Sequence, residues 1–338
     1  MRSLLVIAPS WVGDMVMAQS LFKVLKSADP DQAIDVLAPG WTLPLLARMP
    51  EVRTAIDMPL GHGELKLGVR RRLAVGLRDS NYTQAIVLPN SLKSALVPFW
   101  ARIPQRTGYV GELRQWLLND CRQLDKQRLP MTVQRFVALG LQDGTALPAA
   151  LPYPELLSRQ EDQHTAANRL GVCNQYQPVL ALCPGAEFGP AKQWPEKYYA
   201  DIAKNWLNQG WHVWLFGSAN DLPVCDRINA LAGDGCHNLA GRTSLAEAID
   251  LLAMATFVVT NDSGLMHVAA ALQRPMVAIY GSSDPGFTPP LAETAQVERL
   301  GLDCSPCFKR ECPLGHLKCL RDLSPERVMT AMEEVMKR

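Results

Sequence analysis

The stretch VVTNDSGLMHVAAALQRPMVAIYG, residues 258–281, decides how this chain folds. The apolar run 257–260 ends in the polar turn 261–264, a short helical pattern follows, and a second apolar run begins at Met276. This order of strand, tight turn, helix and strand is typical of α/β proteins. A polar turn that opens a helix presents backbone N–H groups at the positive end of the helix dipole, where a diphosphate can bind. We therefore expect a nucleotide-diphosphate substrate held in an α/β sheet.

The alternation of strand and helix patterns continues along the whole chain. In the first half it comprises short apolar runs at 4–8, 34–38 and 85–88 and helical repeats at 15–26, 67–77 and 91–101. A proline-rich stretch, 147–154, interrupts the alternation. After it come strand patterns at 179–183, 212–216, 257–260 and 276–280 and helical patterns at 195–208, 221–232, 245–254 and 325–337. Alternating units of this kind predict two doubly wound, Rossmann-like domains that face each other across a ligand-binding cleft.

We place the domain boundaries from these patterns. The N-terminal domain is expected at 1–155, the C-terminal domain at 156–324 and a terminal helix at 325–338. A cysteine-rich segment, 304–319, falls near the end of the second domain.

Composition excludes several classes of protein. The 338 residues carry a net charge of +1, which argues against a bulk nucleic-acid binder. The apolar runs have the length of strands, and none approaches the roughly 20 residues that cross a bilayer. The first residues, MRSLLVIAPSWVGD, lack the long apolar core of a signal peptide. We expect a cytosolic protein whose nine cysteines are mostly reduced.

Three loops that follow strands carry candidate chemistry. In the first, Gly13 permits a close backbone approach, and Asp14 is either an N-cap or a general base. In the second, Lys192 is either a phosphate ligand or a solvated loop lysine. In the third, His267 is either a satisfied core histidine or a phosphate donor beside the turn that starts at Asn261.

These motifs together resemble a known family. The segments Ser-Trp-Val-Gly-Asp-Met at 10–15, Pro-Gly-Ala-Glu-Phe-Gly-Pro-Ala-Lys-Gln-Trp-Pro at 184–195 and Thr-Asn-Asp-Ser-Gly-Leu-Met-His at 260–267 are similar to those of the bacterial lipopolysaccharide heptosyltransferases, glycosyltransferase family 9. Further segments at 58–63 and 88–95 fit the type II branch of that family. The resemblance extends from residue 1 to about 290 and is specific, because all of these motifs occur in one chain.

The resemblance implies an inverting transferase of the GT-B fold that requires no metal. It would move L-glycero-D-manno-heptose from ADP-heptose to the first heptose of the inner core, on Kdo2-lipid A. Asp14 would be the general base, and Lys192 would stabilise the departing diphosphate. The residues expected to bind the donor are Gly13, Gly185, Glu187, Asp221, Asp262, Ser263, Gly264 and His267.

Basic residues of the first domain are candidates for the anionic glycolipid acceptor. We assign Lys93, Arg71, Arg72 and Arg106 to it, and we expect the enzyme to lie peripherally at the cytoplasmic face of the inner membrane. A run such as Arg70-Arg71-Arg72 is otherwise a solvated helix face.

The cysteine-rich segment has no place in this mechanism. Cys304, Cys307, Cys312 and Cys319 have spacings compatible with a tetrahedral structural zinc site, and His316 is a spare ligand. A pair of redox-labile disulfides is the alternative. The other cysteines, Cys121, Cys173, Cys183, Cys225 and Cys236, have the pattern of scattered core thiols.

Other functions compete with this interpretation. A type I sibling would act on Kdo2-lipid A itself, and a sugar-nucleotide epimerase would share the architecture. A zinc module that binds a partner leaves the first 290 residues unexplained. A nicotinamide-dependent enzyme is disfavoured because no Gly-x-Gly-x-x-Gly follows the first strand.

Overall fold

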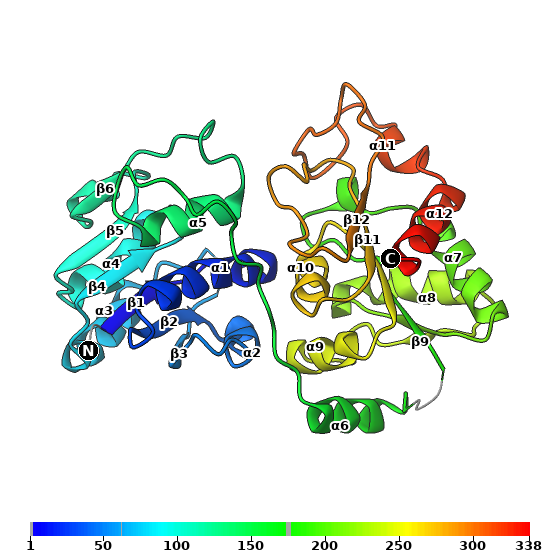
Figure 1. Ribbon diagram of the computed structural model, residues 1–338, viewed down its shortest axis with the longest axis horizontal. Coiled ribbons are helices and arrows are strands. Elements are labelled where there is room, and N and C mark those ends of the chain that lie inside the picture. The colour runs from blue at the N-terminus through cyan, green and yellow to red at the C-terminus, as the bar shows by residue number, and fades with distance from the viewer. Residues whose placement is uncertain (1–2, 62, 174–176) are drawn as a thin grey trace. The chain divides into compact units, whose positions relative to one another are not determined.

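Both halves of the chain build a parallel sheet with the same strand order. The computed structural model describes residues 3–61, 63–173 and 177–338, and the chain divides into two units, Met1–Pro154 and Glu155–Arg338 (Figure 1). In the described residues each unit has one six-stranded sheet. The two doubly wound domains expected from the strand and helix alternation are therefore present.

The first unit has the strand order β3-β2-β1-β4-β5-β6. Its strands are β1 (Ser3–Ile7), β2 (Ala33–Pro39), β3 (Thr54–Met58), β4 (Gln84–Val87), β5 (Gln105–Tyr109) and β6 (Asp120–Arg122). Its helices are α1 (Val12–Ala28), α2 (Leu43–Leu46), α3 (Leu67–Gly76), α4 (Leu92–Trp100) and α5 (Thr132–Gly140). Helix α1 packs against α2 and α5, and α3 packs against α4, so the sheet lies between two helical layers.

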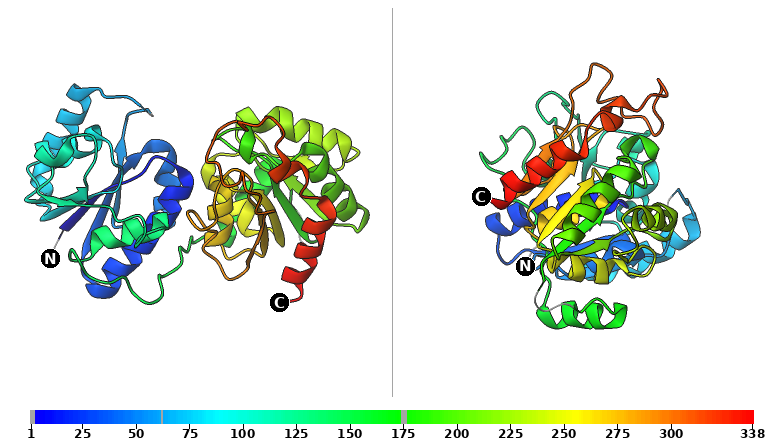
Figure 2. Two further views of the ribbon diagram at one scale, coloured as in Figure 1. Left: turned by 90° about the horizontal axis from the view of Figure 1, so that it is seen from above. Right: turned by 90° about the vertical axis from the view of Figure 1, so that its right-hand side faces the viewer.

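The second unit has the order β12-β11-β10-β7-β8-β9. Its strands are β7 (Val179–Cys183), β8 (His212–Leu215), β9 (His237–Asn238), β10 (Phe257–Asn261), β11 (Met276–Ile279) and β12 (Ala295–Glu298). Its helices are α6 (Gln160–Leu170), α7 (Glu196–Asn208), α8 (Leu222–Leu231), α9 (Leu245–Ala253), α10 (Gly264–Ala271), α11 (Lys318–Arg321) and α12 (Pro325–Met336). Figure 2 shows these strands with helices on both faces.

The order of strands fixes where a ligand can bind in each unit. In both sheets the first three strands are added outward from the centre in one direction and the next three in the other. The order of strands therefore switches between β1 and β4 and between β7 and β10. Loops that leave neighbouring strands at such a point diverge to opposite faces and open a crevice at the carboxyl ends. All candidate donor residues of the second unit follow β7, β8 or β10.

Burial explains why the central strands were evident in the sequence. Strands β7, β10 and β11 are buried along their whole length, as expected for parallel strands covered on both faces. The core on one side of this sheet includes Leu182, Val259 and Ile279 from the strands, with Ile202 and Met332 from the helices above them. Helix α12 packs on α7, β11 and β12, so it is part of the second unit.

The strands that the sequence pattern did not reveal lie toward the sheet edges. Strands β3, β6, β9 and β12 are only partly buried, and β6 and β9 are short and mostly polar. Strand β5 has the sequence QRTGY and is stabilised by polar contacts, since Thr107 Oγ1 donates to Asp120 Oδ2 at 2.9 Å. A hydrophobic repeat is therefore absent where hydrogen bonds replace apolar packing.

None of the helices in the described residues is both long and apolar enough to cross a membrane.

Candidate active site

The loops at the carboxyl ends of β7 and β10 are organised by one buried amide, that of Asn261 at the end of β10. Its Oδ1 accepts hydrogen bonds from the Trp194 backbone N–H at 3.2 Å and from the Tyr199 hydroxyl at 3.0 Å. Its Nδ2 donates to the Pro184 carbonyl at 2.6 Å. Both ends of the loop that leaves β7 are thus tied to the end of β10. Asn261 was not among the predicted site residues, although a polar residue that closes an apolar strand was a usable signal.

The next residue, Asp262, forms an ion pair with Lys192. The Lys192 Nζ lies 2.6 Å from Asp262 Oδ2, and the two side chains are 18% and 4% exposed. The ammonium also lies 5.1 Å from the centre of the Phe188 ring. Lys192, predicted to stabilise the departing diphosphate, and Asp262, predicted to bind the donor, are therefore in direct contact across 70 positions of sequence. The lysine retains a solvent-accessible side through which it can reach an anion.

Helix α10 begins immediately after this ion pair. Ser263 is its N-cap residue in an extended conformation, and the Ser263 side chain makes no capping hydrogen bond. The Ser263 Oγ lies 3.5 Å from Thr260 Oγ1. Backbone N–H groups at an uncapped helix start favour an anionic ligand, as the sequence pattern predicted for Ser263 and Gly264.

His267 lies one turn into α10 and is buried. Burial lowers its pKa to about 4; the nearby Asp262 carboxylate opposes the shift, and Lys192 adds to it. The imidazole is therefore neutral at physiological pH. It can donate or accept one hydrogen bond, but it does not add a positive charge to the crevice.

Asp221 and Gly185 meet at the carboxyl ends of β7 and β8. The Asp221 Oδ2 accepts hydrogen bonds from the Ser218 N–H and hydroxyl, both at 2.8 Å. A side chain at Gly185 or Gly217 would come within 2.6 Å of Asp221, so both positions need glycine. Glu187 is exposed on the same loop as Lys192. The roles of Asp221, Gly185 and Glu187 in binding the donor stay predictions.

In the first unit the loop after β1 leads into α1. The helix begins at Val12, and its N-cap residue is Trp11. Asp14 lies in the first turn and is half-buried, and Gly13 is buried beside it. The N-cap interpretation of Asp14 is therefore wrong, while its role as a base stays a prediction.

The loops at the carboxyl edge of the first unit depend on Arg114, which lies in the loop after β5. Its side chain is fully buried and donates hydrogen bonds to the Tyr109 carbonyl, to Asn90 Oδ1 at 3.0 Å, to Ser94 Oγ at 3.2 Å and to the Pro89 carbonyl. It therefore joins the loop after β5 to the loop after β4. A long, always charged side chain can be buried when every donor finds an acceptor.

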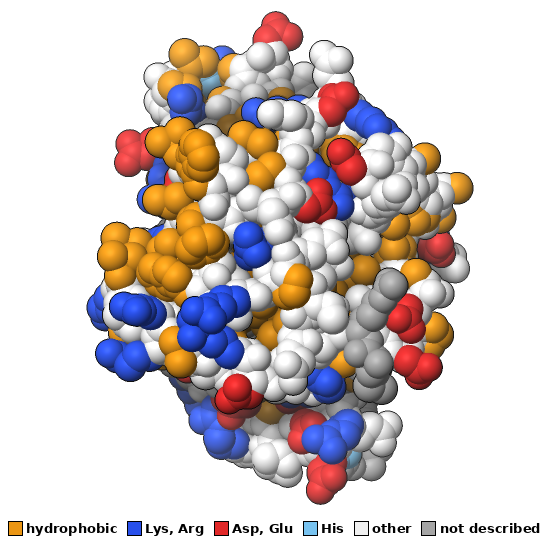
Figure 3. All heavy atoms as spheres, turned by 90° about the vertical axis from the view of Figure 1, so that its left-hand side faces the viewer, with side chains coloured by type: hydrophobic (Ala, Val, Ile, Leu, Met, Phe, Trp, Pro, Cys, Tyr) orange, Lys and Arg blue, Asp and Glu red, His pale blue; other side chains and the backbone are white. Residues whose placement is uncertain are grey.

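The four cations that we assign to the acceptor differ in how exposed their charged groups are. Arg71 and Arg72 are exposed on α3, and Lys93 is half-buried at the start of α4. Arg106 instead donates to the Leu117 carbonyl at 2.7 Å and to the Ile103 carbonyl at 2.5 Å, so much of its guanidinium is already engaged. Figure 3 shows Lys and Arg side chains beside hydrophobic ones on one face of the molecule.

Arg70 differs from its two neighbours on α3. It is buried and donates to the carbonyls of Leu65 at 2.7 Å and Glu64 at 2.9 Å. Arg71 and Arg72 are exposed, which is compatible with an acceptor role and with a solvated helix face alike, whereas the solvated face is wrong for Arg70.

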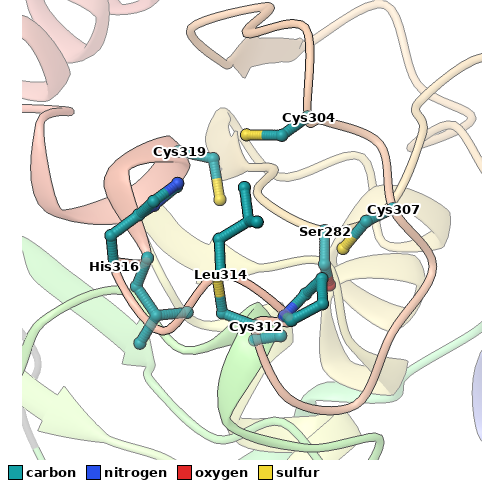
Figure 4. A pocket seen from close by; sticks show the side chains of 10 residues that line it. Ser282, Cys304, Cys307, Cys312, Leu314, His316 and Cys319 are labelled. Atoms are coloured by element: carbon teal, nitrogen blue, oxygen red, sulfur yellow. The ribbon is translucent and has the colours of Figure 1, made fainter.

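The predicted zinc site is not supported. Cys304, Cys307, Cys312 and Cys319 are free thiols that line one pocket with His316 (Figure 4). Within the described parts of the chain, however, no three Cys, His, Asp or Glu side chains are arranged to hold a metal ion. Pro313, Leu314 and Leu317 share the pocket lining, so apolar groups occupy part of the space around the sulfurs. The spacing predicted that the thiols would gather, but spacing does not fix tetrahedral geometry.

The neutral state of His267 predicts a pH dependence of stability. Its pKa in the folded protein, about 4, lies below the ordinary value of 6.5, so the unfolded chain binds a proton that the folded protein does not. The free energy of unfolding should therefore fall as the pH is lowered from about 6.5 toward about 4. His267→Gln should flatten this slope in thermal unfolding, whereas substitution of the exposed His164 should leave it unchanged. Equal slopes in the wild type and His267→Gln would contradict the assignment.

The sequence is similar to that of known glycosyltransferases. Residues 70–318 match the model of glycosyltransferase family 9 (heptosyltransferase). The sequence is 48% identical to lipopolysaccharide heptosyltransferase 2 of Salmonella typhimurium, with 98% of each chain covered. It is 46% identical to lipooligosaccharide heptosyltransferase 2 of Haemophilus influenzae, with 99% of each covered.

A solved structure supports the fold as well. The structure of E. coli ADP-heptose LPS heptosyltransferase II matches with a TM-score of 0.89 and 45% identity, over 100% of this chain and 99% of that one. The expected GT-B fold class, with two parallel sheets flanked by helices, is thereby confirmed. The chain belongs to glycosyltransferase family 9, the heptosyltransferases.

Proposed function

We propose that this glycosyltransferase is of type II. It moves L-glycero-D-manno-heptose from ADP-heptose to the first heptose of the lipopolysaccharide inner core, with inversion at the anomeric carbon. The relatives from Salmonella and Haemophilus that cover nearly the whole chain carry the type 2 name. The observation that carries the proposal is the pairing of Lys192 with Asp262 directly before the uncapped start of α10.

The donor site is matched to the charge that develops during transfer. When the bond between sugar and diphosphate breaks, positive charge grows on the sugar and negative charge on the departing ADP. Lys192 and the N–H groups at the start of α10 are positioned to stabilise that negative charge. The Asp262 carboxylate holds the ammonium in place between catalytic cycles, so little reorganisation is needed when the diphosphate arrives.

Asp14 is our candidate for the general base. Its carboxylate takes the proton of the attacking acceptor hydroxyl, the hydroxyl oxygen bonds to the anomeric carbon, and ADP leaves with the electrons of the broken bond. We assign the base and the diphosphate ligands to different units, because inversion requires the base and the leaving group on opposite faces of the sugar. No step of this reaction calls on a metal ion.

The acceptor is an anionic glycolipid, and we propose that the first unit binds it at the inner-membrane surface. Exposed cations there, Arg71 and Arg72, suit phosphate groups and anionic headgroups. Leu113 and Trp116 follow β5 and are 76% and 81% exposed, so apolar groups are available to a lipid as well. This combination of charge and apolar surface favours peripheral membrane binding.

The base assignment predicts a specific kinetic defect for Asp14→Asn. The amide cannot accept the hydroxyl proton, so kcat should fall by about a hundredfold to ten-thousandfold, the usual contribution of a general base. The affinity for ADP-heptose, measured by calorimetry, should stay unchanged. Full turnover with weakened donor binding would mean that Asp14 binds the donor instead.

The matched control is a charge reversal in the region that we assign to the acceptor. Arg71→Glu together with Arg72→Glu should raise the acceptor KM and spare kcat and the donor KM, because both side chains are exposed and distant in sequence from the donor loops. An unchanged acceptor KM would mean that these arginines form an ordinary solvated helix face and do not bind the acceptor.

Product analysis tests the acceptor choice directly. The purified enzyme is given ADP-heptose with either mono-heptosylated Kdo2-lipid A or Kdo2-lipid A, and products are identified by mass spectrometry. Transfer to the heptosylated acceptor alone is the expected result. Transfer only to Kdo2-lipid A would replace the proposal with the type I activity.

A further inference from the structure

The residues assigned so far to the diphosphate site carry little net positive charge. The Lys192 ammonium lies 2.6 Å from the Asp262 carboxylate, so these two charges largely cancel. Burial lowers the pKa of His267 to about 4, so its imidazole adds no charge at physiological pH. The start of α10 supplies only about half a positive charge. Each phosphate group of a nucleotide diphosphate carries about one negative charge, and more develops as the sugar departs. The site therefore calls for a second cation.

Arg310 is an exposed cation on the same aromatic side chain as Lys192. Its guanidinium carbon lies 5.6 Å from the centre of the Phe188 ring, and the Lys192 ammonium lies 5.1 Å from that centre. Phe188 belongs to the loop that leaves β7, residues 184–195. Among the ion pairs of the described residues none involves Arg310, whereas Lys192 is paired. The Arg310 charge is therefore available to an anion.

The backbone at Arg310 is fixed to the loop that carries Lys192. The Ala191 N–H donates a hydrogen bond to the Arg310 carbonyl at 3.0 Å. A side chain at Gly189, where φ is +145°, would come within 2.7 Å of the same carbonyl oxygen. Glycine at this position therefore permits the two segments to approach each other. The position of Arg310 relative to Lys192 is thus set by backbone contacts.

The chain before Arg310 is held in the same way at the end of β11. The Phe308 N–H donates to the Ser282 carbonyl at 2.7 Å, and the Ser282 N–H donates to the Ala191 carbonyl at 3.3 Å. Residues 299–317 form neither helix nor strand, so these hydrogen bonds order an irregular stretch of chain. Three segments that are distant in sequence therefore hold Arg310 beside the loop of the diphosphate site.

We propose that Arg310 is the second cation of the diphosphate site. Its guanidinium binds a phosphate oxygen of the donor next to the Lys192 ammonium, and both groups stabilise the negative charge that develops on ADP as the bond to the sugar breaks. Cation–π attraction to Phe188 holds the two cations near each other, against their mutual repulsion, until the anion binds. This inference rests on the donor role proposed above for Lys192. It gives a function to a stretch of chain that the mechanism otherwise leaves unused.

ADP binding to Arg310→Gln tests the proposal, because this substitution removes the charge and keeps the carbonyl that contacts Ala191. Isothermal titration should show ADP affinity weakened by about tenfold to a hundredfold, the usual loss for a charge-assisted hydrogen bond. The affinity should also depend less steeply on salt concentration than in the wild type, since one cation fewer contacts phosphate. Arg310→Lys should recover part of the affinity, because it restores the charge without the planar guanidinium.

Lys309→Gln is the matched control. It removes one positive charge from the neighbouring residue, which is also exposed, and should leave ADP affinity at the wild-type value. Equal weakening by Lys309→Gln and Arg310→Gln would reduce the effect to general surface charge and overturn the proposal. Wild-type ADP affinity in Arg310→Gln would overturn it as well. So would weakened affinity with the salt dependence of the wild type, which indicates a structural effect.

This experiment separates the role of Arg310 from the proposed function. ADP binds without an acceptor, so the titration reports on the diphosphate site even if neither acceptor is glycosylated. Failure of transfer to both acceptors by the wild type would count against the proposed function. Wild-type ADP affinity in Arg310→Gln, with normal transfer by the wild type, would reject the role of Arg310 alone.

Discussion

The candidate donor site depends on the polar contacts at the end of β10. Asn261 ties both ends of the loop after β7 to this strand, and Asp262 pairs with Lys192 on that loop. A buried Asp262 carboxylate without its cation would strongly destabilise the folded protein. The ion pair therefore fixes the position of the loop as well as that of the Lys192 ammonium group. The same few residues therefore determine the local fold and the position of the cation that we propose binds the diphosphate.

A comparable arrangement stabilises the first unit by different chemistry. There a buried arginine, Arg114, satisfies carbonyl and amide oxygens on two loops at the carboxyl edge of the sheet. The result is a pair of loops whose positions are fixed relative to each other. Each unit thus uses a buried, fully bonded polar side chain to order two loops at the carboxyl edge of its sheet, those after β4 and β5 in the first unit and those after β7 and β10 in the second.

The sequence predicted the central strands, the two sheets and the donor loops, because these depend on apolar periodicity and on short polar turns. Strand β5, one position in from the sheet edge, and the edge strand β9 escaped prediction, since their sequences carry no hydrophobic repeat. The contact of Lys192 with Asp262 follows once both loops leave neighbouring central strands. Burial of Arg70 and Arg114 could not be foreseen, because a local pattern does not show which carbonyls will surround a guanidinium. The zinc prediction failed for a related reason: spacing gathers thiols but does not set their geometry.

The central claim is that the Lys192 ammonium group binds the diphosphate of the donor. Isothermal titration of ADP into Lys192→Gln tests it most directly, with Lys197→Gln, an exposed lysine on the adjoining helix, as the control. Loss of a charge-assisted contact to phosphate should weaken ADP binding by about tenfold to a hundredfold, and the control should bind as the wild type does. Wild-type ADP affinity in a folded Lys192→Gln enzyme would contradict the account.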